Sequence, residues 1–182
     1  MTRALIALSV ILGLALPLAA AQDDPRLAPL FQELGRTASP DEGQRLGREI
    51  AAIWLESGRP DIDLLVSEGR QFLASGDLHH AVDRFRRVTL LAPDFAEGWN
   101  KLGHAFFLVG DYVTARDSVL MALELEPRHF LALGGLAVIH LRLGEEGEAL
   151  DAMERALAVN PHLPGTRAQA ERLRLKLEGR DT

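Results

Sequence analysis

Residues 96–129 read AEGWNKLGHAFFLVGDYVTARDSVLMALELEPRH, and their apolar pattern is the clearest in the chain. Its first half places apolar and small residues at the spacing of one helix face, namely Trp99, Leu102, Gly103 and Phe106. Its second half repeats that spacing with Ala115, Val119 and Ala122. The stretch therefore predicts two consecutive helices that bury their apolar faces against each other.

Three glycine and aspartate positions predict how these helices meet. Gly110 can take the left-handed backbone conformation that ends a helix, and Asp111 can cap the helix that follows. Gly103 lacks a side chain where the two helices of the pair must approach closely. We expect the same close approach at Gly69 and Ala137, which stand one repeat before and one repeat after it.

The pattern recurs every 34 residues along most of the chain. Proline, glycine and alanine each keep this step, at Pro93, Pro127 and Pro161, at Gly76, Gly110 and Gly144, and at Ala81, Ala115 and Ala149. Counted from Ile62, the period gives three complete units, 62–95, 96–129 and 130–163. A fixed period of this kind is typical of proteins whose repeats stack to share one core.

These units resemble the tetratricopeptide repeat (TPR) family, in which each repeat is a helix–turn–helix pair. The resemblance implies an all-α, right-handed α-solenoid whose work is protein binding and not catalysis. The layout of the whole chain is similar to small exported TPR proteins of Gram-negative bacteria. That likeness implies a scaffold or adaptor of the cell envelope.

The two flanks are expected to close the stack. Residues 164–182 predict a capping helix and a tail after the third unit. Residues 22–61 predict two helices, over 28–35 and 41–55, and Ser39 with Glu42 forms a capping box before the second. We expect this N-terminal pair to be a degenerate repeat in the same stack.

Residues 1–21 have the pattern of a secretory signal peptide. Arg3 precedes an apolar run, and the small residues 19–21 offer a cleavage site before Gln22. The alternative is an uncleaved membrane anchor, although the apolar run is short for a span. The sequence thus predicts a periplasmic protein. Because the chain has no cysteine, it has no site for lipid attachment and no disulfide.

The charge of the chain limits the kinds of partner. Lysine and arginine number 20 against 26 acidic residues, so the net charge is −6. An acidic chain is a poor ligand for nucleic acid, whose phosphates require a basic surface. No second long apolar run follows the first, which predicts no stable membrane span after signal cleavage. A monomer is the favoured oligomeric state.

Catalytic and metal-binding patterns are weak. The sequence has no phosphate-binding loop, no nucleophile elbow and no zinc-protease motif, so we expect neither an enzyme nor a cofactor. His79 and His80 are adjacent residues, whose side chains diverge on a helix, and no third ligand is evident. A metal-binding or enzymatic periplasmic protein using His79, His80 or His104 is kept as an alternative function. A self-associating structural repeat is another.

The resemblance to TPR proteins also implies where a partner binds, because the first helices of such a stack line its concave groove. The groove positions in this chain are Asp63, Val66, Arg70, Glu97, Asn100, Lys101, His104, Phe107, Val138 and Leu141, with Gly134 beside them. Their mixture of charged, amide and apolar groups suits a protein or peptide partner. Arg70, Asn100 and His104 are the preferred three, since each can donate a hydrogen bond.

The sequence lacks the residues that define one subclass of the TPR family. TPR proteins that clamp the C-terminal carboxylates of cytosolic chaperones share basic and amide residues at five groove positions. This chain has Val66, Arg70, Lys101, Leu131 and Gly135 there. The clamp is therefore absent, and we expect an adaptor for another kind of partner, in envelope assembly or maintenance.

Overall fold

The computed structural model describes residues 21–179, so residues 1–20 of the expected signal peptide lie outside the described part. Every regular element of residues 21–179 is helical, which confirms the all-α prediction. In chain order the elements are η1 (Ala21–Asp23), α1 (Leu27–Arg36), α2 (Pro40–Trp54), α3 (Pro60–Ser75), α4 (Leu78–Leu91), α5 (Ala96–Val109), α6 (Tyr112–Leu125), α7 (Phe130–Leu143), α8 (Glu146–Val159) and α9 (Thr166–Glu178).

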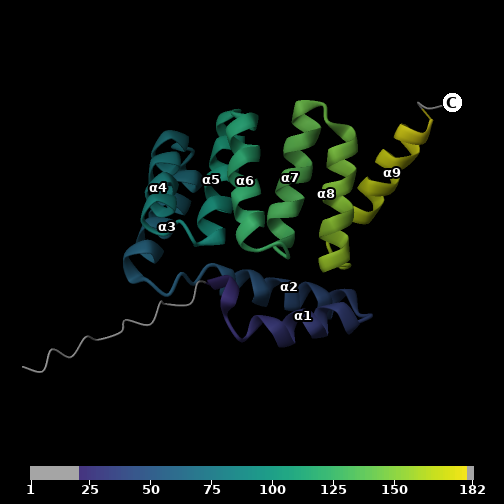
Figure 1. Ribbon diagram of the computed structural model, residues 1–182, viewed down its shortest axis with the longest axis horizontal. Helices are drawn as coiled ribbons and strands as arrows, with labels where there is room; N and C mark the ends of the chain where they lie inside the picture. Colours follow the sequence, from purple (N-terminus) through teal and green to yellow (C-terminus); the bar gives the residue numbers. More distant parts are fainter. Residues whose placement is uncertain (1–20, 180–182) are drawn as a thin grey trace, which may run out of the picture.

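Helices α3 to α8 form three antiparallel pairs that stand side by side (Figure 1). The pairs are α3–α4, α5–α6 and α7–α8, and α9 packs on α8 as the predicted capping helix. Their shared core is built mainly from alanine, leucine and a few aromatic residues, with Phe85, Leu133 and Met153 among the most deeply buried. This arrangement confirms the predicted α-solenoid.

The turn inside each pair is formed by the periodic glycines. Gly76, Gly110 and Gly144 have φ angles of 79°, 92° and 80°, a left-handed conformation that glycine adopts at no steric cost. In the first two turns the next residue is an aspartate whose carboxylate accepts a hydrogen bond from the backbone N–H three residues later. The predicted cap at Asp111 is one of these.

The predicted close approach of paired helices is also present. A Cβ added at Gly103 would lie 2.5 Å from Cγ2 of Val119 and 2.9 Å from the carbonyl oxygen of Ala115. A Cβ added at Gly69 would lie 2.7 Å from the ring of Phe85. Both positions therefore require glycine because a neighbouring helix occupies the space of a side chain.

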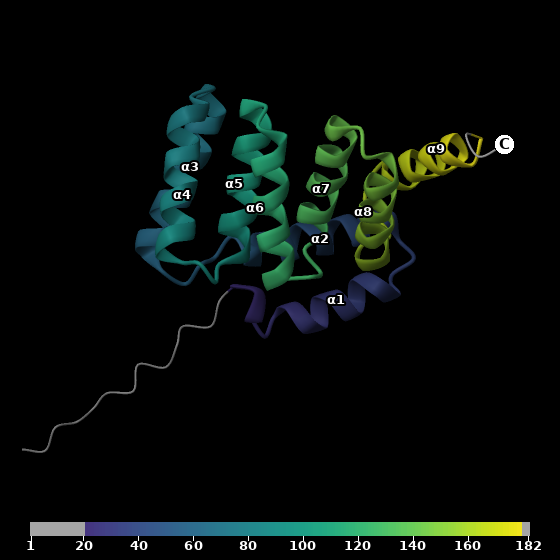
Figure 2. The same ribbon diagram turned by 45° about the horizontal axis from the view of Figure 1, so that its top comes forward.

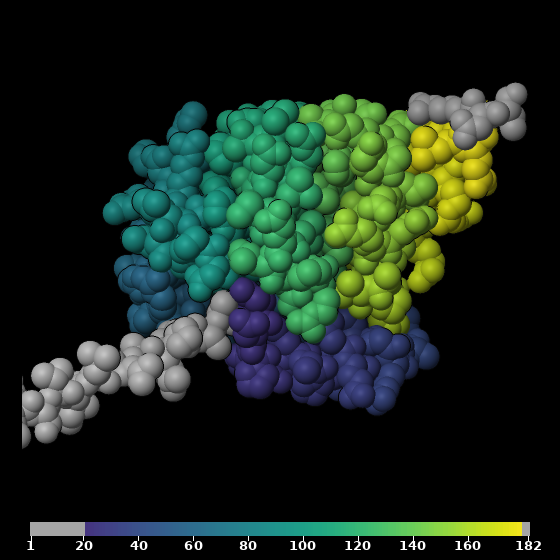
Figure 3. All heavy atoms as spheres, viewed as in Figure 1, coloured from purple at the N-terminus to yellow at the C-terminus, as the bar shows by residue number. Residues whose placement is uncertain are grey.

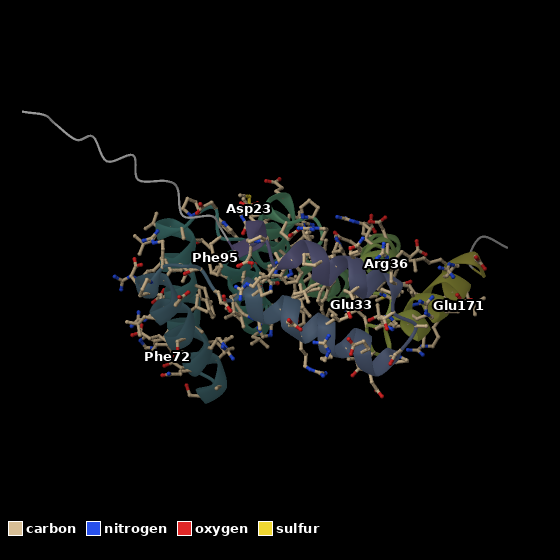
Figure 4. The ribbon with its side chains drawn as sticks, turned by 90° about the horizontal axis from the view of Figure 1, so that it is seen from below. Asp23, Glu33, Arg36, Phe72, Phe95 and Glu171 are labelled. Atoms are coloured by element: carbon tan, nitrogen blue, oxygen red, sulfur yellow. The ribbon has the colours of Figure 1, made fainter. Side chains whose placement is uncertain are left out.

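The N-terminal hairpin, α1 and α2, differs from the expected degenerate repeat. It lies across the ends of the repeat helices instead of standing in line with them (Figures 1 and 2). Seen from below, it runs along the row of repeats, with Asp23 near Phe95 and Arg36 toward the α9 end that carries Glu171 (Figure 4). The space-filling view shows it packed along the lower edge of the stack (Figure 3).

Small residues on α2 and one large residue hold the hairpin there. Gly43 and Gly47 let α2 approach the loop after α8, since added Cβ atoms would lie 2.2 Å from the His162 ring and 3.1 Å from the Asn160 amide. His162 Nε2 lies 3.1 Å from the Thr37 carbonyl oxygen. Trp54, at the end of α2, is 1% exposed and packs against the start of α7.

Among residues 21–179, no helix is long and apolar enough to cross a membrane.

Candidate binding groove

A cavity of about 410 Å³ lies between α5 and α7, the first helices of the second and third repeats. Its lining residues are Asn100, Lys101, His104, Phe107, Val119, Leu131, Gly135, Val138 and Ile139. Five of the ten predicted groove residues thus meet at one place, namely Asn100, Lys101, His104, Phe107 and Val138. The wall is mostly apolar, and the amide, ammonium and imidazole groups come from α5.

Gly135 of α7 lines the cavity at a place that a larger side chain would fill, and Gly134 precedes it. Gly134 and Gly135 stand at the repeat positions that hold Asn100 and Lys101 in the preceding unit. Added Cβ atoms at Gly134 and Gly135 would meet nothing within 4 Å, so neither glycine is required by packing. Both lie inside a helix, where glycine costs about 1 kcal/mol relative to alanine. Their effect is to leave the α7 side of the groove open.

Glu97 is a buried residue of α5 that contacts two polar side chains of the groove. It is 3% exposed, and its carboxylate accepts hydrogen bonds from Lys101 Nζ at 2.8 Å and Asn100 Nδ2 at 2.6 Å. The prediction placed Glu97 among the residues that face a partner. In the structure it is instead a buried positioning residue, which fixes the two groove side chains beside it.

A buried histidine completes this network. His129 Nδ1 accepts the Ala132 backbone N–H at 3.2 Å, so its Nε2–H donates to the Glu97 carboxylate at 2.9 Å. On the other side the His129 ring stacks on Trp54, with ring centroids 4.0 Å apart. The network therefore connects the hairpin, the loop before α7 and the groove side chains of α5.

Two titratable groups at the groove, Glu97 beneath the cavity and His104 in its wall, have shifted pKa values. Burial alone would raise the pKa of Glu97, but the hydrogen bond from His129 and the charge of Lys101 outweigh it and lower the pKa to about 2. Burial lowers the pKa of His104 from its usual 6.5, and the charge of Lys101 adds to this. At neutral pH the groove thus has a neutral imidazole beside a fully paired carboxylate.

The other predicted groove residues lie outside the cavity. Asp63 accepts hydrogen bonds from the backbone N–H and hydroxyl of Ser57, at 3.0 and 2.6 Å, and so orders the loop before α3. Val66 is 3% exposed and belongs to a buried cluster with Ile62, Val88 and Phe95. Arg70 is exposed on α3, and Leu141 packs against the core.

Four lining residues were missing from the prediction, namely Val119, Leu131, Gly135 and Ile139. Leu131 could have been found from the period, since it stands 34 residues after Glu97. Gly135 has no side chain, and a sequence gives no direct sign that a cavity lies beside a glycine.

The histidines considered for metal binding are not brought together. His80 Nδ1 lies 2.7 Å from Asp77 Oδ2 at the start of α4, whereas His104 lines the cavity on α5. Across residues 21–179, the structure gathers no group of three histidine, aspartate or glutamate side chains able to hold a metal ion.

Comparison with known proteins identifies the family. The profile of the tetratricopeptide repeat matches residues 66–125 and 109–164, and the chain belongs to this family. A TPR repeat-containing protein of Rhizobium etli is 33% identical over 157 residues, which cover 86% of this chain and 77% of that protein. Protein bimA of Emericella nidulans is 27% identical over 121 residues, only 15% of its length.

Solved structures with low sequence identity share the fold. The first TPR of Spaghetti, bound to an HSP90 peptide, superposes with a TM-score of 0.62 at 17% identity and covers 64% of this chain and 93% of its own. The TPR2B domain of yeast Sti1, in its pHsp70 complex, has a TM-score of 0.58 at 18% identity and covers 65% of this chain and 97% of its own.

Proposed function

We propose that this protein is a non-enzymatic adaptor that binds a peptide segment of a partner protein in the groove between α5 and α7. The cavity beside Gly135 carries the proposal, because a folded helix gains nothing from two adjacent glycines that packing does not require. A concave apolar site with a few oriented polar groups is the usual form of a binding pocket. Asn100, Lys101 and His104 supply those polar groups.

The peptide complexes of the two TPR structures support a peptide as the ligand class. The groove chemistry argues for a different peptide from those of the chaperone-clamp subclass. At two clamp positions that line the cavity this chain has Leu131 and Gly135 in place of basic residues, so the site offers apolar surface where that subclass has donors. We infer a partner segment that inserts an apolar side chain between α5 and α7.

We further propose that the protein works in the periplasm, in assembly or maintenance of the cell envelope. The pattern of residues 1–21, with Arg3, an apolar run and small residues before Gln22, supports export. The absence of cysteine is compatible with an oxidising compartment, where an unpaired thiol would be a liability.

Site-specific photocrosslinking in the native cells tests the groove. A photoreactive phenylalanine replaces Val138, which lines the cavity, and in a matched variant it replaces Val113, which is 52% exposed on α6. We expect a discrete adduct from position 138 that is lost when Gly135→Leu fills the cavity. An adduct formed only from position 113 would place binding on the convex face and refute the proposal.

A further inference from the structure

A second hollow of about 310 Å³ lies where the N-terminal hairpin meets the repeats. It lies between α2, the start of α7 and the loop after α8, and it is lined by Gln44, Gly47, Arg48, Ala51, Phe130, Leu131, Asn160, His162, Leu163 and Pro164. Leu131 lines this hollow and the groove cavity alike, and it is 43% exposed. The two hollows are therefore neighbours on one surface, with Leu131 between them.

The hairpin contributes unpaired polar groups to this surface. Gln44, Arg48 and Ala51 follow each other at helical spacing on one side of α2. Within the described part of the chain, neither Gln44 nor Arg48 makes a side-chain hydrogen bond or ion pair. Arg45, by contrast, lies on another side of the helix and is paired with Glu42 and Glu49 at 2.7 Å each. The free amide and guanidinium thus belong to the side of α2 that lines the hollow.

The charge of the surface indicates what it can bind. No carboxylate lines either hollow, and Glu97 beneath the groove is already paired with Lys101. The uncompensated charge is the guanidinium of Arg48, although the whole chain is acidic at −6. An acidic group beside Arg48 would be attracted there, and a carboxylate fits a guanidinium with two parallel hydrogen bonds.

We propose that the two hollows together bind one extended peptide segment with two bulky apolar side chains and a carboxylate near the second. The first apolar side chain enters the cavity beside Gly135, and the second enters the hollow beside Ala51, next to Arg48. This inference rests on the proposed function and extends it, because it makes the hairpin part of the binding surface. Because the hairpin crosses the ends of the repeat helices, α2 lies beside the start of α7, a position that an additional stacked repeat would not occupy.

An extended segment fits better than a helix because of the polar groups along the path. Gln44 and His104 each present hydrogen-bonding groups that have no partner within residues 21–179. An extended backbone offers free N–H and C=O groups to such side chains, whereas a helix has already used its own.

Selection from a random library of twelve-residue peptides displayed on phage tests the inference with the mature full-length chain. We expect enriched peptides to share two apolar positions and an acidic residue close to one of them. The Kd of a synthetic peptide from the selection is then measured for Gly135→Leu, Ala51→Trp and Arg48→Glu. Each variant should weaken binding at least ~10-fold, or about 1.4 kcal/mol. The control Arg87→Glu, exposed on α4, should change Kd less than ~2-fold, below about 0.4 kcal/mol.

The variants separate the inference from the function on which it rests. If only Gly135→Leu weakens binding, the groove binds peptide and the inference about the hairpin is overturned. If Gly135→Leu has no effect, or if no peptide is enriched, the proposed function fails as well. Ala51 is half-buried, so the folding of Ala51→Trp is checked by circular dichroism. If that variant is misfolded, the Kd of Arg48→Glu, whose side chain is exposed, decides whether the hairpin takes part in binding. Enriched peptides with helical spacing of apolar residues would overturn the extended conformation.

Discussion

Glu97 combines nearly complete burial with three hydrogen-bonding partners, and its ionisation should contribute to stability. Its pKa is lowered from 4.5 to about 2 in the folded protein, so the carboxylate stabilises the fold above pH 4.5 and this contribution is lost as the pH falls toward 2. Glu97→Gln should lower the unfolding free energy at pH 7 by roughly 3 kcal/mol, at about 1.4 kcal/mol per pKa unit. Urea denaturation measures this difference.

The pH series supplies the control for Glu97. The gap between the wild type and Glu97→Gln should narrow steadily between pH 4.5 and pH 2, the range between the unfolded and folded pKa values. Glu124→Gln, at an exposed position on α6, should leave stability almost unchanged throughout. A gap that is constant with pH would show that the glutamine variant loses packing and not charge.

Two glycines on neighbouring first helices should respond in opposite directions to substitution. Gly103→Leu places atoms where Val119 and the Ala115 carbonyl already lie, and overpacking of this kind costs about 1–3 kcal/mol. Gly135→Ala meets open space within a helix and should stabilise by about 0.5–1 kcal/mol. In thermal melting, the Tm of Gly103→Leu should lie below that of the wild type and the Tm of Gly135→Ala above it. Equal shifts would mean that the two positions have the same surroundings.

At the scale of elements, the position of the hairpin depends on the small residues of α2. Gly43→Ala puts a Cβ 2.2 Å from the His162 ring, so either the ring or α2 must move. We expect a loss of about 1–3 kcal/mol and faster amide hydrogen exchange in α1 and α2, with the repeats less affected. Gly35→Ala is the matched control, because an added Cβ there meets nothing within 4 Å. Unchanged exchange in α2 would mean that the hairpin is not held by this contact.

The elements of the repeats could be predicted because each one is encoded by its own residues. Helix faces and turn glycines recur in register in all three repeats, and the capping aspartate recurs in the first two, so tertiary packing did not have to be known. The placement of the hairpin could not be predicted in this way. It depends on contacts between α2 and a loop more than 100 residues later, such as Gly43 with His162.

One residue did indicate that no repeat precedes α3. Glu68 stands at the repeat position of Leu102 and Leu136, which are buried, and Arg84 stands at that of Ser118. In the structure the Glu68 carboxylate accepts a hydrogen bond from Arg84 Nε at 2.6 Å, on the end of the stack that another repeat would otherwise cover. A charged residue at a position that is leucine in the other two repeats, paired with an arginine on the neighbouring helix, thus marks the end of the solenoid.

The candidate site was predictable to a similar degree. Four predicted residues of α5 line the cavity, because the direction of a first-helix side chain follows from the helix period alone; they are Asn100, Lys101, His104 and Phe107. Their contact with a partner stays a prediction. The burial of Glu97 was missed because it depends on His129, which stands where Phe95 and Leu163 stand in the neighbouring repeats. An isolated histidine at an apolar position does not reveal which carboxylate it meets.

At the scale of the whole molecule, export can be tested directly. We predict that the mature protein begins at Gln22, since small residues precede it and an apolar run precedes them. N-terminal sequencing of protein from the periplasmic fraction measures this. A mature chain that still begins near Met1 would instead favour the membrane anchor.

The hairpin that crosses the stack also affects how the molecule comes apart. In an open solenoid each repeat contacts only its neighbours, so an end repeat can unravel while the rest stays folded. Here Thr37 contacts His162 across 125 residues of chain, and Trp54 stacks on His129 between the second and third repeats. Helices α1 and α2 therefore complete their packing only after the third repeat has been synthesised. Unfolding of α8 should therefore loosen α2 at the same time. We expect a single cooperative unfolding transition, whereas a simple row of repeats would fray from its end.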